Sequence, residues 1–290
     1  MTTTKESWTL GRLLDWTAKH LAGKGSESPR LDAEVLLAHA QECRRIELYT
    51  RYAEEAADDV RTRFRDLVRK RIEGCPVAYL VSRKEFFSLE LEVGPAVLIP
   101  RPDTETLVME ALALSKAMPS PAFVDVGTGS GAIAIAIGKN HPGAHVTAID
   151  IGAEALAIAQ RNSAKHGVAG RITFQEGDLL QNVAIDATFD FIVSNPPYIA
   201  TEELPKLPIG VQQYEPKLAL DGGPGGYQVI ERLVESAHRH LKSGGYLLVE
   251  IGAPQEETVR QLVSKHSEYE LAPTIRDYSG HPRVVKARRK

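Results

Sequence analysis

The chain has 290 residues, 43% of them hydrophobic and 25% charged, and it carries a net charge of −3. This composition is typical of globular proteins and leaves room for one large or two ordinary domains. A slightly acidic chain argues against an extended, sequence-independent grip on DNA or RNA, which needs a basic surface. The two cysteines, Cys43 and Cys75, form neither a disulfide framework nor a zinc-binding pattern, so we expect no metal site.

The beginning of the chain bears on its location. Residues Met1 to Leu10 lack the long apolar run of a signal peptide. No stretch of about 18 apolar residues, the length of a membrane span, occurs anywhere. We therefore expect a cytoplasmic protein.

Residues 1–75 are expected to form a small helical bundle. Apolar residues recur at helical spacing from about Trp8 to Leu21, from Ser28 to about Ala40, and from about Ala56 to Ile72. No strand-like segment interrupts them, which favours helices packed on one another.

Residues 76–100 are expected to form a β-hairpin that links two domains. The end of the segment 86–93 alternates between apolar and polar residues as a strand does. Gly94-Pro95 is a turn signal, and Val97–Ile99 would be the second strand.

Residues 101–290 predict an α/β domain. After a helix over about 104–118, strands are expected at 123–126, 145–150, 172–175, 189–194, 245–251, 269–277 and 283–287, and helices at 132–139, 153–166, 228–241 and 256–266. Such alternation predicts a doubly wound, mainly parallel sheet with helices on both faces. The segment 200–227, rich in Pro and Gly, is expected to be a loop without regular structure, and loops of that length are usually functional.

A glycine-rich loop, Gly127-Thr128-Gly129-Ser130-Gly131, lies between an expected strand and an expected helix. Glycine allows a tight turn and a close approach of a ligand to the backbone. Dinucleotide-binding folds carry GxGxxG, whereas this GxGxG spacing is that of methyltransferases that use S-adenosylmethionine (SAM). The alternative is a plain strand-to-helix turn.

Two aspartates end the next two expected strands. Asp150 follows the glycine loop by about 20 residues, where dinucleotide folds place a carboxylate that accepts from ribose hydroxyls. Asp178 is positioned to accept from the adenine amino group. The alternatives are a helix-capping role for Asp150 and a turn aspartate at Asp178.

The tetrad Asn195-Pro196-Pro197-Tyr198 follows another apolar strand. Ligands bind at the carboxyl ends of strands in such sheets. Prolines lack N–H donors, so the Asn195 side chain and the Pro196 carbonyl can accept the two hydrogens of a planar NH2 group. Tyr198 offers a flat face to that group. Catalysis would come from positioning and from acceptors matched to charge developing on nitrogen, without a strong general base.

Together these residues resemble the HemK/PrmC family, the protein-(glutamine-N5) methyltransferases that modify peptide chain release factors. The resemblance covers nearly the whole chain and adds further motifs to the glycine loop and the tetrad. Those motifs are Ser28 to Glu34, Arg101-Pro102-Asp103-Thr104-Glu105, Tyr214-Glu215-Pro216 with Ala219-Leu220, and the pair Asp277 and Arg283. Leu179 stands where some relatives carry an aromatic residue, and Asp103 replaces a more common Glu.

The resemblance implies a SAM-dependent, Rossmann-like catalytic domain over 101–290 and a protein-recognition role for the helical residues 1–75. It implies that the substrate is the glutamine of the GGQ motif in class 1 release factors. It implies catalytic roles for Asn195, Pro196 and Tyr198, and glutamine binding by Asn195 to Tyr198. The cofactor contacts that it implies are Gly127, Thr128, Gly129, Ser130, Gly131, Asp150, Asp178, Leu179 and Asn195.

Two other functions remain open from the residues alone. Adenine-N6 methyltransferases of DNA or RNA share the tetrad, although they are expected to carry a basic groove and a pocket for a flipped base. A SAM-binding regulator without turnover is the third hypothesis, because folds outlast activities. We expect a monomer that binds release factors, with no stable nucleic-acid binding and no membrane association.

Overall fold

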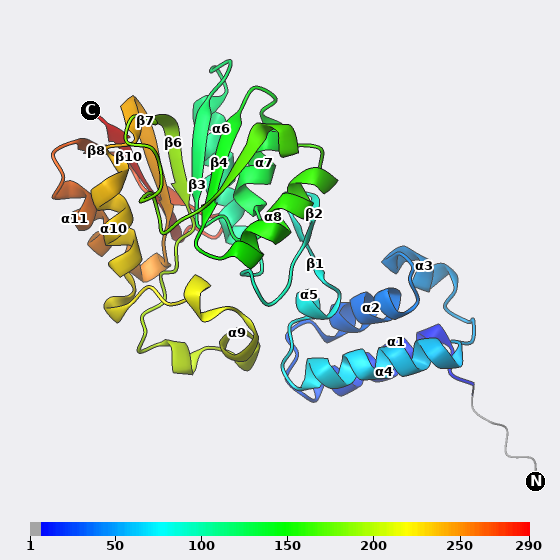
Figure 1. Cartoon of the computed structure of the whole chain (residues 1–290). Coiled ribbons are helices and arrows are strands. Elements are labelled where there is room, and N and C mark those ends of the chain that lie inside the picture. The colour runs from blue at the N-terminus through cyan, green and yellow to red at the C-terminus, as the bar shows by residue number, and fades with distance from the viewer. Residues whose placement is uncertain (1–6) are drawn as a thin grey trace, which may run out of the picture. The chain divides into compact units, whose positions relative to one another are not determined.

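The computed structural model describes residues 7–290 (Figure 1). The first six residues of the helical bundle expected over 1–75 therefore lie outside the described residues. The chain divides into two compact units. One contains the part up to Ser82 together with Ile209–Tyr214, and the other contains Arg83–Pro208 and Glu215–Lys290. The first unit is helical and the second is α/β.

The helical unit contains the three predicted helices, which are α1 (Leu10–Ala22), α2 (Pro29–Ala40) and α4 (Asp58–Ile72). Leucines and Phe64 on their inner faces form one core. Two short helices, α3 (Arg45–Thr50) and α5 (Val77–Leu80), were not predicted. Six and four residues are too few to show an apolar period in sequence.

The helical unit also contains α9 (Ile209–Tyr214), although this helix comes from the middle of the chain. Gly74 makes the contact possible. A Cβ there would lie 2.8 Å from Cγ2 of Ile209, and the φ of Gly74 is +101°. A side chain at residue 74 would therefore be both strained and in collision with α9.

The hairpin differs from its prediction. Strands β1 (Arg83–Phe86) and β2 (Leu89–Glu92) pair antiparallel, with Arg83 opposite Glu92. The turn is Phe87-Ser88 with φ values of 51° and 58°, and Val97–Ile99 is not a strand. This is the left-handed turn that suits the twist of a hairpin, but it normally uses Asn or Gly. The strand expected over 86–93 therefore runs only over 89–92, and the hairpin reverses before it. Gly94-Pro95 does lie in a turn, in which the Val97 N–H donates to the Gly94 carbonyl at 3.0 Å, but this is not the turn of the hairpin.

The second unit is built on a mixed sheet with the strand order β5-β4-β3-β6-β7-β10-β8, and β9 pairs with β10. Strands β3 to β7 run parallel and β10 runs antiparallel to β7. This confirms the predicted doubly wound sheet. The strands are β3 (Ala122–Val126), β4 (His145–Asp150), β5 (Ile172–Glu176), β6 (Phe189–Ser194), β7 (Leu241–Glu250), β8 (Tyr269–Leu271), β9 (Ile275–Arg276) and β10 (Pro282–Arg289).

Helices cover both faces of this sheet. The apolar faces of α6 (Glu105–Ser115) and α7 (Ala132–Asn140) pack into one core cluster with Phe123 and Phe191, whose rings stack at 4.6 Å. The apolar faces of α10 (Gln228–Ala237) and α11 (Glu256–Ser264) pack into a second core cluster on the opposite side of the strands. Helix α8 (Ala153–Lys165) follows β4 (Figure 1).

Two strand predictions need correction. Strand β7 begins at Leu241, although the expected helix ran to residue 241 and the expected strand began at residue 245. The extra strand residues come from a bulge, at which the partners of β6 jump from Leu241 to Tyr246. The single strand expected over 269–277 is split into β8 and β9.

The segment 200–227 is not structureless. Besides α9 it contains three single turns of 3-10 helix, η3 (Leu204–Lys206), η4 (Lys217–Ala219) and η5 (Pro224–Gly226). A proline stands at the beginning of η3 and η5, where its fixed φ suits the first helical turn. Elements of three residues carry no periodic signal, so sequence pattern alone could not find them.

Candidate functional site

The carboxyl ends of β3, β4, β5 and β6 meet at one edge of the sheet and surround a cavity of about 330 Å³. Most of the predicted site residues line it, whereas Gly131, Pro196 and Tyr198 do not. The predicted residues on its walls are Gly127, Thr128, Gly129, Ser130, Asp150, Asp178, Leu179, Asn195 and Pro197. The sheet topology therefore brings together four segments that are far apart in sequence.

The glycine loop is held against β4. The backbone N–H groups of Gly127 and Thr128 donate to the carbonyl of Ile149 at 2.8 and 2.9 Å. Gly131 caps α7 with a φ of +81°, and a Cβ there would lie 2.9 Å from Cδ1 of Ile135. Gly131 therefore allows the loop to pack closely against helix α7, and it does not line the cavity.

Asp125 is the next-to-last residue of β3 and fixes the same loop. Its Oδ2 accepts from the Thr128 hydroxyl at 2.6 Å and from the backbone N–H of Ala134 at 3.2 Å. The side chain is buried, and burial raises its pKa to about 7. Its Oδ1 has no hydrogen-bond partner among residues 7–290. The sequence analysis did not predict a role for Asp125.

Asp150 is the last residue of β4 and accepts from two backbone N–H groups. Its Oδ2 accepts from the N–H of Gly129 at 2.8 Å, and its Oδ1 accepts from the N–H of Gly152 just before α8 at 2.9 Å. Each carboxylate oxygen has a further lone pair, so the group retains acceptor capacity toward the cavity. Because Gly152 is itself the N-cap residue of α8, Asp150 does not cap the free N–H groups of the first helical turn. Acceptance from a ligand hydroxyl stays a prediction.

Asp178 and Leu179 form the part of the wall after β5. Asp178 Oδ2 accepts from the Arg232 guanidinium at 2.6 Å, and Arg232 also lines the cavity. Leu179 has a φ of +54°, which is unusual for a residue with a branched side chain. Strain of this kind is found at ligand sites, where the surrounding structure enforces it.

The tetrad is anchored from both ends. The Ser194 hydroxyl donates to the Val126 carbonyl at 2.7 Å, and the Tyr198 carbonyl accepts from Gln255 at 2.8 Å. Asn195 Nδ2 donates to Thr104 Oγ1 at 3.0 Å, which leaves Asn195 Oδ1 as an acceptor. The Tyr198 ring packs against the second core cluster, and burial raises the pKa of its hydroxyl, so that hydroxyl stays neutral.

The structure also brings into contact sequence motifs that were not expected to touch, namely those at 101–105 and 214–216 and the pair Asp277 and Arg283. Glu215, with 1% of its side chain exposed, accepts from Arg101 at 2.5 Å and from the Ile99 N–H at 3.3 Å. Arg283 pairs with Asp103 and with Asp277, both at 2.8 Å. Only the family resemblance marked these positions, because no local spacing links Arg101 to Glu215 or Asp103 to Arg283, which lie more than 100 residues apart in sequence.

Glu250 is a further residue that sequence reasoning missed. It is the last residue of β7 and is 1% exposed. Neither carboxyl oxygen has a hydrogen-bond partner within the described chain, and burial raises the pKa to about 7. In the sequence Glu250 simply follows an apolar run, and nothing in that pattern indicates that its side chain is buried without a partner.

The cavity fits S-adenosylmethionine by the chemistry of its walls. A glycine loop provides backbone close to the space, Asp150 provides an acceptor for hydroxyl groups, and Leu179 provides an apolar surface for a flat ring. Asp178 and Asn195 add two further acceptors. These residues match the amino acid, ribose and adenine portions of that cofactor.

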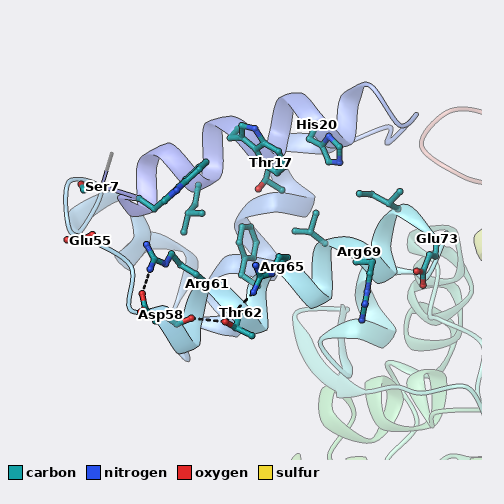
Figure 2. Close-up of a pocket in the computed structure, with 16 residues that line it drawn as sticks. Ser7, Thr17, His20, Glu55, Asp58, Arg61, Thr62, Arg65, Arg69 and Glu73 are labelled. Atoms are coloured by element: carbon teal, nitrogen blue, oxygen red, sulfur yellow. Dashed lines mark hydrogen bonds and ion pairs between the residues drawn. The ribbon is translucent and has the colours of Figure 1, made fainter. Parts of the chain in front are cut away.

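A second hollow, of about 1200 Å³, lies within the helical unit between α1 and α4 (Figure 2). Arg61, Arg65 and Arg69 line it from α4, one helical turn apart. On the α1 side, Trp16 is 51% exposed and stacks on His20 at a ring distance of 4.8 Å. We call this hollow the α1–α4 groove.

Among the helices of residues 7–290, none has the length and apolar character needed to cross a membrane.

Comparison with known proteins identifies relatives for both units. The sequence model of the PrmC N-terminal domain matches residues 12–81, and that of the methyltransferase small domain matches residues 103–207. The release factor glutamine methyltransferase of Rhodopirellula baltica is 44% identical over 96% of this chain and 95% of its own length. That of Geobacter sulfurreducens is 41% identical over 99% of each.

Two solved methyltransferase structures resemble about seven tenths of this chain. A methyltransferase from Pyrococcus furiosus matches 70% of this chain and 90% of its own, with a TM-score of 0.50 and 20% identity. The T. thermophilus 16S rRNA N2 G1207 methyltransferase, solved with AdoMet and guanosine, matches 72% of this chain and 50% of its own at a TM-score of 0.51 and 16% identity. At such identities the likeness shows the methyltransferase fold alone.

Proposed function

Because the chain belongs to the release factor glutamine methyltransferase family, we propose that it methylates the side-chain amide N5 of the GGQ glutamine in class 1 release factors. The methyl donor is S-adenosylmethionine, which supplies an activated methyl group on a sulfonium. The observation that carries the proposal is the orientation of Asn195, whose Nδ2 is occupied by Thr104 and whose Oδ1 is left to accept. The relatives favour this function over adenine-N6 methylation.

The tetrad would prepare a poor nucleophile. An amide lone pair is delocalised, so the nitrogen must be held with both hydrogens away from the direction of attack. Asn195 Oδ1 and the Pro196 carbonyl accept those two hydrogens, while Pro197 and Tyr198 provide the flat surface against which the amide lies. These acceptors also stabilise the positive charge that develops on the nitrogen, and the fixed geometry lowers the entropic cost of the transfer. As the nitrogen bonds to the methyl carbon, the S–CH3 bond would break, S-adenosylhomocysteine would leave, and the nitrogen would give up one proton to water.

The cofactor would be held by the walls described above. Gly127 to Gly131 form the loop beneath it, Asp150 accepts from the ribose hydroxyls, and Asp178 with Leu179 contacts the adenine. Asp178 is already paired with Arg232 through Oδ2, so its contact with adenine would use the other oxygen.

We assign the parts of the chain as 1–75 for recognition of the release factor, 76–100 as the linker, and 101–290 as the catalytic domain. The α1–α4 groove supports the recognition role, because Trp16 is half exposed and Arg65 has no acidic partner among the described residues. Aromatic and arginine side chains of this kind dominate protein interfaces. A segment of the release factor is the occupant we assign to the groove.

We further propose that the chain acts as a monomer in the cytoplasm, where translation factors work, without stable nucleic-acid binding. A labelling assay tests the main function. Incubation with methyl-labelled SAM and a class 1 release factor is expected to label the factor, and replacing the GGQ glutamine by alanine is expected to abolish the label. Label that persists in the alanine variant would refute the proposal, and label on bare DNA or RNA alone would favour the adenine alternative.

A further inference from the structure

Glu250 lies beside the tetrad because their strands are neighbours. β6 and β7 run parallel with Ser194 opposite Val249, so the next residues, Asn195 and Glu250, leave the sheet side by side. Thr104 is buried and accepts from Asn195 at 3.0 Å. The hydroxyls of Thr104 and Tyr198 both face the Glu250 carboxyl group and favour its charged form.

A buried carboxylate needs donors. Burying a charged group without them is costly, and neither oxygen of Glu250 has a partner with full hydrogen-bonding geometry among residues 7–290. An ionised carboxylate can only accept, and of the two hydroxyls that face it the Thr104 hydroxyl is the one that also contacts Asn195. We take the Thr104 hydroxyl to donate to Glu250. The hydroxyl then has only lone pairs left for its other neighbour, which is Asn195.

We propose that Glu250 is a positioning residue that sets the direction of the hydrogen bonds from Asn195 through Thr104. With Glu250 ionised, Thr104 donates to it and accepts from Asn195 Nδ2, so Asn195 must present Oδ1 to the substrate. With a donor in place of the carboxylate, Thr104 can instead donate to Asn195. The amide could then turn its NH2 toward the substrate, and one of the two acceptors would be lost.

The charged groups around Glu250 are few. Arg283 favours the ionised form, whereas Asp103 opposes it, and Arg283 is shared with Asp103 and Asp277. Burial outweighs these effects and raises the pKa of Glu250 to about 7. Asn195 would therefore be oriented for catalysis in a growing fraction of molecules as the pH rises through neutrality.

This inference rests on the proposed function, and its test uses the full chain with SAM and a class 1 release factor. Glu250→Gln keeps the shape of the side chain but adds an NH2 donor. We expect Glu250→Gln to lower kcat at pH 8 about tenfold or more, as loss of one aligned hydrogen-bonding group at a reacting centre does. The Kd for SAM is expected to stay within about twofold, because Glu250 does not line the cofactor cavity.

The second arm separates positioning from a merely structural role. In a Thr104→Val background the link between Glu250 and Asn195 is absent, so adding Glu250→Gln is expected to cause little further loss of kcat. The acidic limb of the parent's pH profile is also expected to disappear in Glu250→Gln. Glu110→Gln, which changes a half-buried acid paired with Lys286 away from the tetrad, is the matched control and should keep the parent kcat.

The outcomes are distinct. An unlabelled release factor with the parent enzyme would refute the proposed function and this inference with it. A labelled factor together with an unchanged kcat for Glu250→Gln would refute the inference alone. Fully additive losses of kcat for Glu250→Gln and Thr104→Val would also refute it, because they would show that Glu250 does not act through Thr104.

Discussion

Arg101 and Glu215 are 114 residues apart in sequence and form an ion pair of 2.5 Å in the α/β unit. The two partners differ in burial, since 37% of the Arg101 side chain and 1% of the Glu215 side chain are exposed. Glu215 also accepts from the Ile99 N–H, so it ties the start of the motif at 101–105 to the segment after α9. The pair therefore holds in place the residue range that includes Thr104.

The unequal burial predicts unequal costs of removing either partner. Arg101→Ala leaves the Glu215 carboxylate buried without its cation, and we expect the free energy of unfolding to fall by about 2–3 kcal/mol, somewhat less than for a fully buried pair. Glu215→Ala leaves a guanidinium that can reach water, so a smaller loss of about 1–2 kcal/mol is expected. Urea denaturation of both variants measures the difference, and a larger loss for Glu215→Ala would contradict this explanation.

Asp150 is expected to contribute directly to cofactor affinity. It holds the N–H of Gly129 and keeps a lone pair toward the cavity, so Asp150→Ala removes both an acceptor and a support of the loop. We expect the Kd for SAM to rise about tenfold or more, as for the loss of a hydrogen bond to a charged group. Isothermal titration calorimetry measures this Kd. The control is Glu154→Gln, which changes an exposed acid of the same region. Equal Kd values in parent and Asp150→Ala would rule out the contact.

Asp125 is expected to make stability depend on pH. Burial raises its pKa in the folded state to about 7, whereas the ordinary pKa of an aspartate is 3.8. Between these values the folded state holds a proton that the unfolded state has lost. The free energy of unfolding therefore falls as the pH rises from about 4 to about 7, by at most about 1.4 kcal/mol per pH unit, and levels off above that window. Asp125→Asn is neutral throughout and is expected to flatten this slope.

Denaturation of the parent and of Asp125→Asn at pH 5, 6, 7 and 8 measures the slopes. Asp186→Asn removes an exposed carboxylate and controls for the change in net charge. Parallel curves for the parent and Asp125→Asn would show that burial does not shift this group in solution.

Trp16 is expected to contribute to release-factor recognition. It is half exposed at the α1–α4 groove and is held by stacking on His20. We expect Trp16→Ala to raise the KM for the release factor about tenfold, since exposed aromatic anchors dominate interfaces. The kcat and the Kd for SAM should stay near their parent values. Ile46→Ala, at a 63% exposed apolar residue outside the groove, is the matched control, and equal effects of the two changes would count against a specific role for the groove.

The hairpin shows why some elements escape prediction from sequence. Phe87 and Ser88 both adopt a left-handed backbone, although neither residue type favours it. The N–H of Phe87 donates to Glu105 at 2.9 Å, so a contact 18 residues away supports the turn. The turn signal at Gly94-Pro95 marks a real turn, but the hairpin reverses at Phe87-Ser88, where a tertiary contact outweighs local preference.

The sequence by itself determined the sheet and the chemistry of its edge. Alternating apolar segments marked β3 to β6, and the glycine loop, Asp150 and the tetrad follow those strands directly, so their convergence was predictable from parallel topology. Only the tertiary structure decided the contacts between distant segments, namely Thr104 with Asn195, Arg101 with Glu215, and Glu250 beside the tetrad. The physical reason is that strand order and periodicity are local properties of the chain, whereas burial of a charge and the partner of a hydrogen bond depend on which remote residues the fold brings near.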